Sequence, residues 1–223
     1  MKAPTILTCI AAASAAASAA PVTENPFAEF SVQTFAELPS EFTSGPREAG
    51  IGDDSVLFTS TNGSSVFAYD AAYALNTNGD WGGGRRGFVG LNAPFGTLRF
   101  TFATPVSGVG AFVNYAPPPT SNGEAILTVR GADDQILETF NLSIDAPIVT
   151  PDAVDAGAFR GFERQRADIV AFELSNGFIV LDDLTWSREN AFTLPVPVPA
   201  ALPLFLAGAG ALGIGRRTRK GRG

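Results

Sequence analysis

Acidic side chains offer most of the chemistry that this sequence could perform. Three adjacent pairs, Asp53-Asp54, Asp133-Asp134 and Asp182-Asp183, could supply general acids or ligands for an ion. Neighbouring residues on a strand point to opposite faces, so a pair acts together only where it lies in a loop. The chain contains no His, which excludes Ser-His-Asp and Cys-His relays, His-ligated zinc and an imidazole pH switch. Any catalysis would depend on Asp, Glu, Tyr and Arg.

Calcium is the ion that these carboxylates would suit, because Ca²⁺ takes about six to eight hard oxygen ligands. Asp53, Asp54, Asp182 and Asp183 are the candidate ligands of a structural Ca²⁺, the one cofactor that the sequence suggests. Neither an EF-hand nor a Gly-Asp repeat is present, so solvated loop acids are the alternative. We expect Asp182 and Asp183 to point in opposite directions, with one carboxylate outward and one inward. Asp133-Asp134 is typical of a turn.

A Gly-rich loop over residues 76–87 is the best candidate for a binding surface. Its Gly-Gly-Gly-Arg-Arg run lacks the Lys-Ser/Thr of a phosphate-binding loop. An exposed Trp81 would offer a stacking face to a sugar ring, with polar groups from Asn78, Asp80 and Arg85 at the edge of that ring. This hypothesis makes an exopolysaccharide the partner. The alternative is that Trp81 plugs one end of the domain.

The elements that must position these residues are short strands. Leu98, Phe100 and Phe102 alternate with Arg99 and Thr101, which is the period-two pattern of a half-buried strand. Residues 132–135 and 175–177 are candidate hairpin turns. We therefore predict an all-β fold, an antiparallel β-sandwich that is jelly-roll-like. The expected strands cover residues 28–35, 55–59, 64–70, 88–92, 96–102, 108–115, 125–130, 135–142, 158–163, 168–175 and 178–186.

Charge is segregated along the chain, although the whole has a formal net charge of −7. All 22 acidic residues and nine arginines lie between residues 24 and 189, which gives this stretch a formal charge of −13 without any lysine. Phosphate binding needs a basic surface, so a nucleic-acid partner is not expected. Acidic polymers would also be repelled unless a cation bridged them.

Residues 1–20 have the pattern of a secretory signal peptide. Lys2 is followed by an apolar, Ala-rich stretch, and Ala17-Ser18-Ala19 suits signal peptidase. An Ala-rich helix of the mature fold is the alternative, although it would have no polar face. Cys9, the single cysteine, is expected to be removed with this leader, which leaves a mature protein without thiols.

The C-terminal segment combines a spacer, an apolar run and a basic end. In residues 194–199, proline alternates with leucine and valine, which favours an extended spacer. Residues 200–215 contain no polar side chain and would span roughly 24 Å as a single hydrophobic helix, slightly less than the ~30 Å hydrocarbon core. The positive-inside rule places the basic cluster after this run in the cytoplasm. A buried core helix or a disordered tail is the alternative. The basic residues are Arg216, Arg217, Arg219, Lys220 and Arg222.

These three ordered parts closely resemble the VPLPA-CTERM sorting signal, a relative of the PEP-CTERM signals. The resemblance covers about the last 28 residues, and Val198 stands where the family has Leu. It implies that an exosortase, a membrane-embedded transpeptidase-like enzyme of Gram-negative bacteria that make exopolysaccharide, recognises this tail. It also implies that residues 200–215 are a transient membrane anchor and that the basic end is a retention signal. The implied recognition motif is Val196, Pro197, Val198, Pro199 and Ala200.

The sequence thus predicts four regions: a signal peptide (1–20), a β-sandwich domain (21–193), a Pro-rich spacer (194–199) and a sorting helix with its basic tail (200–223). The expected product is an exported protein of the cell envelope or extracellular matrix. It would be anchored transiently in the inner membrane and then lie at the cell surface or outside the cell. Its expected role is non-enzymatic, in adhesion or glycan binding. A surface-anchored lyase or hydrolase and an unprocessed membrane-anchored protein are the alternatives.

Overall fold

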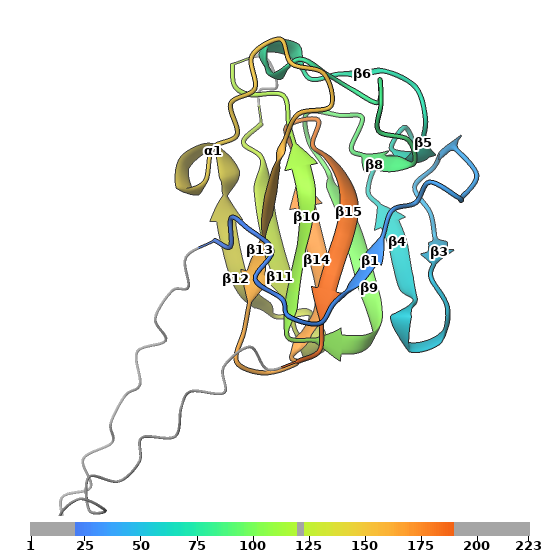
Figure 1. Ribbon diagram of the computed structural model, residues 1–223, viewed down its shortest axis with the longest axis vertical. Helices are drawn as coiled ribbons and strands as arrows, with labels where there is room; N and C mark the ends of the chain where they lie inside the picture. Colours follow the sequence, from blue (N-terminus) through green and yellow to red (C-terminus); the bar gives the residue numbers. More distant parts are fainter. Residues whose placement is uncertain (1–20, 120–122, 190–223) are drawn as a thin grey trace, which may run out of the picture. The chain divides into compact units, whose positions relative to one another are not determined.

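Two antiparallel β-sheets packed face to face form the domain in the computed structural model, which describes residues 21–119 and 123–189 (Figure 1). The expected signal peptide (1–20), Pro-rich spacer (194–199) and sorting helix with its basic tail (200–223) lie outside the described residues. Within the described ranges, no helix combines the length and the apolar character that crossing a membrane requires.

Sheet A has the strand order β13-β10-β15-β8-β5-β2, and β1 also pairs with β15. Every pairing in this sheet is antiparallel. Its strands are β1 (Ser31–Gln33), β2 (Glu41–Phe42), β5 (Val66–Tyr69), β8 (Phe88–Gly90), β10 (Gly108–Asn114), β13 (Ala158–Glu163) and β15 (Val180–Ser187).

Sheet B has the order β12-β11-β14-β9-β4-β3 and is also antiparallel throughout. A short hairpin, β6 (Tyr73–Ala74) with β7 (Asp80–Trp81), forms a third, two-stranded sheet. Helical turns are short, and α1 (Leu142–Asp145) is the one α-helix among the described residues. The strands of sheet B are β3 (Arg47–Ala49), β4 (Val56–Ser60), β9 (Thr97–Val106), β11 (Ile126–Arg130), β12 (Ile136–Asn141) and β14 (Ile169–Ser175).

The structure confirms the prediction of an antiparallel, sandwich-like β fold. Each of the eleven expected strands overlaps an observed one, although β9 continues to Val106, beyond the expected end at residue 102. Four shorter strands, β2, β3, β6 and β7, were not predicted. They have two or three residues each, which is too few to show an alternating pattern.

Phenylalanine side chains hold the two sheets together. Phe67 of sheet A lies 5.0 Å from Phe58 of sheet B, measured between ring centroids. Phe162 of sheet A stacks on Phe140 of sheet B at 4.6 Å. Aromatic pairs at such separations stabilise by about 0.5–1.5 kcal/mol beyond the burial of their area. These aromatic contacts thus join the two sheets at two places, β5 to β4 and β13 to β12, within a core that also contains many aliphatic side chains.

Strand β9 shows how the sequence directs side chains into this core. Leu98, Phe100 and Phe102 are buried, whereas Arg99 and Thr101 lie on the outer face, as the alternation predicted. Along β9, sheet B therefore has one apolar face and one polar face.

Sheet A differs because its outer face is also covered. In β15, seven of the eight residues are buried, which removes the alternation between exposed and buried positions. The cover is a second apolar cluster that includes residues of the β6–β7 hairpin, and its members are Val66, Tyr73, Leu75, Trp81, Phe88 and Val180. This cover leaves only part of the outer face of sheet A open to solvent.

The two predicted hairpin turns have different outcomes. Ala132–Asp134 forms a short 3-10 turn that joins the paired strands β11 and β12, and Asp133 and Asp134 both adopt positive φ. The prediction of a hairpin at residues 175–177 is wrong, because β14 belongs to sheet B and β15 to sheet A. The turn instead carries the chain from one sheet to the other.

We expect Phe100→Ala to lower the free energy of unfolding by about 3–5 kcal/mol, because it leaves a cavity in the inter-sheet core. The matched control is Phe95→Ala, because Phe95 is 60% exposed whereas Phe100 is fully buried. The control should change stability by less than about 0.5 kcal/mol. Urea denaturation followed by tryptophan fluorescence measures both, and equal losses would contradict this description of the core.

Candidate functional site

Trp81, the expected sugar-stacking residue, is fully buried. Its ring stacks on Phe88, with centroids 5.9 Å apart and ring planes 2° from parallel, and Phe112 packs edge-on against it. A ring that stacks on a sugar needs an open face. The hypothesis of an exposed Trp81 is therefore wrong. Trp81 is buried, as the alternative required, but it covers the outer face of sheet A rather than one end of the domain.

Asn78 is buried as well, and its amide anchors the Gly-rich loop to the domain. The amide nitrogen donates to the side chain of Asn114 and to the carbonyl oxygens of Tyr115 and Ile148, at 2.9–3.0 Å. Its oxygen accepts from the backbone N–H of Thr150. Asn78 therefore has a structural role here and offers no free edge to a sugar.

Asp80 is exposed, and its backbone pairs with a neighbouring segment: its N–H donates to Ala153 and its carbonyl accepts from Asp155. Glycine is required beside it, because a Cβ on Gly79 would lie 1.9 Å from the carbonyl oxygen of Ala153. The structure thus does not gather Asn78, Asp80, Trp81 and Arg85 on one binding surface.

Asp182 and Asp183 both contact Arg85, so the expectation that they point to opposite faces is wrong. Arg85 Nη1 lies 3.2 Å from Asp182 Oδ2 and 3.1 Å from Asp183 Oδ2. The pairing between β10 and β15 shifts register at this point, and Asp183 has a φ of +50°. A β-bulge breaks the strict alternation of side chains and thereby turns both carboxylates toward one guanidinium.

The ion cluster lies against the aromatic cover of sheet A. The Arg85 guanidinium carbon is 3.9 Å from the centroid of Phe112, a cation–π contact. Burial raises the pKa of Asp182, whereas the backbone N–H of Asp183, which donates to Asp182, acts in the opposite direction. The nearby Asp183 carboxylate raises this pKa further, and Arg85 lowers it.

The other two candidate calcium ligands lie elsewhere. Asp53 and Asp54 are exposed in a 3-10 turn (Gly52–Asp54), where the Asp54 carboxylate accepts from Arg188 and Ser31. Arg188 directly follows β15 and lies six residues after Asp182, which corresponds to roughly 20 Å of extended chain. The structure therefore does not bring the two pairs together. In the part of the chain that the structure describes, no three acidic, His or Cys side chains are grouped as metal ligands would be.

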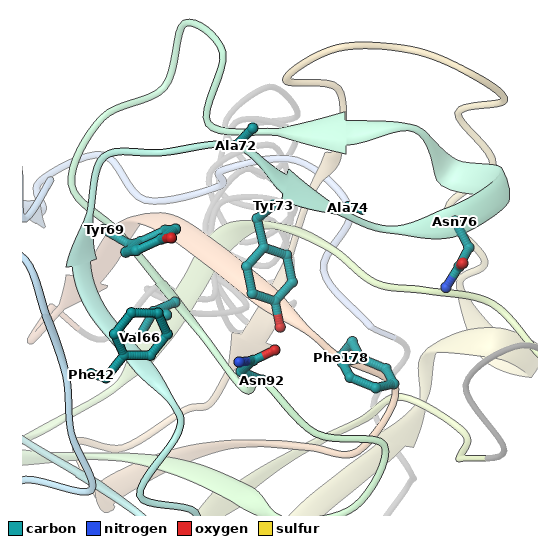
Figure 2. Close-up of a pocket in the computed structure, with 9 residues that line it drawn as sticks. All are labelled: Phe42, Val66, Tyr69, Ala72, Tyr73, Ala74, Asn76, Asn92 and Phe178. Carbon is teal, nitrogen blue, oxygen red and sulfur yellow. The ribbon is translucent and has the colours of Figure 1, made fainter.

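An open cleft of about 320 Å³ adjoins the Trp81 cluster on the outer face of sheet A (Figure 2). Figure 2 shows Tyr73 extending from β6 toward Asn92, with Tyr69 and Phe42 on one side and Phe178 on the other. The volume lies at the lower end of the range for small-molecule sites. The lining residues are Phe42, Val66, Tyr69, Ala72, Tyr73, Ala74, Asn76, Asn92 and Phe178.

The aromatic wall of the cleft continues the cover of sheet A out to solvent. Phe42 is 58% exposed and packs edge-on against Tyr69, which in turn packs against the buried Phe88. Tyr73 donates its hydroxyl to the carbonyl oxygen of Leu91 at 3.0 Å, and burial raises the pKa of this phenol. The wall is therefore uncharged near neutral pH and held in place by packing.

The opposite side of the cleft is formed by the turn between the sheets. Asn176, Gly177 and Phe178 have consecutive positive φ values of 63°, 68° and 50°. An aromatic residue rarely adopts this conformation, and such strain is often found at binding sites. Asn76 and Asn92, both exposed, add amide groups that can donate and accept hydrogen bonds. The cleft thus combines aromatic faces with amides, and none of its lining residues is charged.

Sequence reasoning did not find this cleft. Phe42 and Tyr73 lie on two-residue strands outside every expected strand. Phe178 was expected to begin the strand of residues 178–186, but it lies in a turn before β15. One signal was available in the sequence. Phe42 stands between polar residues, and Phe178 directly follows Asn-Gly, a pair typical of turns. An aromatic residue in such a position is less expected to serve the core alone.

We expect the stability of the wild type relative to Asp182→Asn to fall as pH rises from about 4, the ordinary Asp value. A raised pKa means that the native state keeps its proton where the unfolded state has lost it, so raising the pH favours unfolding. Urea midpoints measured across the acidic range test this.

Asp54→Asn is the control with the opposite sign. Its hydrogen bond from Arg188 lowers the pKa of Asp54, so the wild type should lose stability relative to this variant as pH falls below about 4. Parallel pH profiles for the two variants would contradict the contrast between the two sites.

In comparisons with known proteins, no protein-family model, no curated protein and no solved structure matches the chain.

Proposed function

We propose that the domain is a non-enzymatic module that binds neutral glycan chains in the aromatic cleft of sheet A. One observation carries the proposal: an open cleft has aromatic walls and two exposed amides but no charged lining residue. A sugar ring has an apolar C–H face and a rim of hydroxyls. Phe42, Tyr69 and Phe178 suit the face, and Asn76 and Asn92 suit the rim.

Charge supports a neutral ligand over an acidic one. The stretch from residue 24 to residue 189 has a formal charge of −13, and the cleft contributes no guanidinium that would attract a uronate or a sulfate. An anionic polymer would therefore approach against the field of the whole domain.

The rest of the chain supports an extracellular role for this module. The leader of residues 1–20, the VPLPA-like tail and the acidic, thiol-free domain agree with export through signal peptidase and sorting by an exosortase. In this proposal residues 200–215 form a transient membrane helix, and the mature protein is located at the cell surface or in the matrix, where exopolysaccharide is the source of glycan.

The proposed fold is jelly-roll-like. Strands from β8 to β11 alternate between the two sheets, which favours this type of connection.

We expect Phe42→Ala to weaken binding of a neutral hexasaccharide about tenfold, because it removes an exposed stacking face without opening the core. Isothermal titration calorimetry of the full chain with cellohexaose, laminarihexaose and mannohexaose measures this. Phe95→Ala is the matched control, since Phe95 is 60% exposed but does not line the cleft.

Three results would contradict the proposal. Equal affinities of the wild type and Phe42→Ala would exclude this cleft as the site. No binding of any of the three hexasaccharides would contradict glycan binding itself. Release of new reducing ends during the titration would identify a carbohydrate-active enzyme instead.

The sorting part of the proposal has its own test, mass spectrometry of the C-terminus of protein recovered from the envelope. We expect mature protein that lacks the basic tail, and Pro197→Ala should cause full-length chain to accumulate. Pro195→Ala is the control, because Pro195 lies in the same spacer but outside the motif of residues 196–200. An intact Gly223 on mature wild-type protein would contradict exosortase processing.

A further inference from the structure

A second cleft, of about 290 Å³, lies on the outer face of sheet B. It therefore opens on the side of the sandwich opposite the aromatic cleft. Its chemistry is different, because it has no aromatic lining residue. The residues that line it are Thr59, Ser60, Thr61, Thr97, Arg99, Arg130 and Glu173.

Strand register places polar side chains side by side at this cleft. Thr59 of β4 is opposite Arg99 of β9, and Arg99 is opposite Glu173 of β14. Thr97, two residues before Arg99 on the same face of β9, is opposite Ser175 of β14. Directly opposed residues on one face lie about 4.5–5.5 Å apart, so these groups form a continuous polar surface across three strands.

Ion pairs hold the centre of this surface in a fixed arrangement. Glu173, whose side chain is only 9% exposed, accepts from Arg99 at 2.9 Å and from Arg130 at 2.7 Å. The hydrogen bond to Glu173 raises the pKa of Arg130. Asp134 adds a second carboxylate, 2.6 Å from Arg99. The two guanidiniums and two carboxylates cancel in formal charge, so this surface offers paired donors and acceptors without a net charge.

Hydroxyl groups surround this centre. Thr61 accepts from the backbone N–H of Thr97 at 2.9 Å, and the Thr97 hydroxyl lies 2.9 Å from that of Ser175. A hydroxyl that accepts a hydrogen bond still has its own O–H to donate. The cleft thus presents donors and acceptors at the spacing of neighbouring strands, which suits a ligand with several hydroxyl groups.

We propose that this cleft is a second saccharide site, which recognises the hydroxyl groups of a neutral glycan by hydrogen bonds and without ring stacking. The ligand class rests on the proposed function of the aromatic cleft, whereas the site itself rests on the Arg99–Glu173–Arg130 arrangement. Because the two clefts open on opposite faces, one domain would join two glycan chains, or two parts of one chain. Such bivalence increases avidity without any new contact.

The test is a ¹H–¹⁵N NMR titration of the full chain with cellohexaose, laminarihexaose and mannohexaose. We expect at least one of these to shift the backbone amides of residues 59–61 and 97–99, in addition to amides around the aromatic cleft. If a hexasaccharide shifts only the amides around the aromatic cleft, the second site is overturned and the proposed function stands. If shifts occur only at residues 59–61 and 97–99, the aromatic cleft fails and the second site stands. No shift at either place overturns both.

Two variants test whether the second set of shifts comes from binding in this cleft or from weak contacts anywhere on the outer face of sheet B. Thr59→Leu places an apolar side chain in the cleft and should weaken the second set of shifts about tenfold while it leaves the first set unchanged. The matched control is Thr139→Leu, because Thr139 is an exposed residue of β12 in the same sheet, does not line the cleft and, among the described residues, bonds through its hydroxyl only to Thr128 and Leu127. The second site is also overturned if Thr59→Leu titrates like the wild type, or if Thr139→Leu alters the second set as strongly.

Discussion

The stacked contact between Trp81 and Phe88 is the interaction on which the outer face of sheet A depends. Trp81 belongs to the β6–β7 hairpin and Phe88 to the sheet, so this contact holds the hairpin over strands that would otherwise face water. Phe112 and Tyr73 pack around the same pair. The open cleft begins where this cover ends. Its wall residues Tyr69 and Tyr73 both pack against Phe88, so the buried cluster holds them in place.

The two outer faces of the sandwich differ in chemistry because one sheet is covered and the other is not. On sheet A, aromatic side chains extend from the buried cluster to the exposed Phe42. On sheet B, polar side chains of β4, β9, β11 and β14 gather on the outer face, and ion pairs such as Arg99–Glu173 satisfy the groups that packing partly buries. A single fold thereby presents two different surfaces, one with aromatic faces and one with polar and charged side chains.

Much of the fold could be predicted, because alternation over five or more residues is a strong signal. The long strand β9 and the turn at Asp133-Asp134 were evident from their residue types. What the sequence did not reveal was tertiary: which sheet each strand joins, and whether an outer face is covered. The error at residues 175–177 is of the first kind and the error for Trp81 is of the second.

The site was harder to predict than the fold, for two physical reasons. A β-bulge and a positive φ at Asp183 are set by pairing with β10, and neither leaves a mark in the local pattern around Asp182. The aromatic cleft gathers residues from segments far apart in the chain, from Phe42 to Phe178. Short strands and turns contribute most of them, and these are the elements in which residue periodicity is least informative.

Pairing of the arginines bears on how well this domain would resist trypsin-like proteases. Trypsin-like enzymes need an arginine or a lysine on accessible backbone, and the stretch from residue 24 to residue 189 contains no lysine. Arg85, Arg99, Arg130 and Arg164 are held in ion pairs, and Arg160 is buried against backbone carbonyls. Arg86 and Arg166 are exposed in loops, and neither forms an ion pair with another described residue. Nicking by such enzymes would therefore concentrate at these two loops, because exposed loops are where proteases cut first.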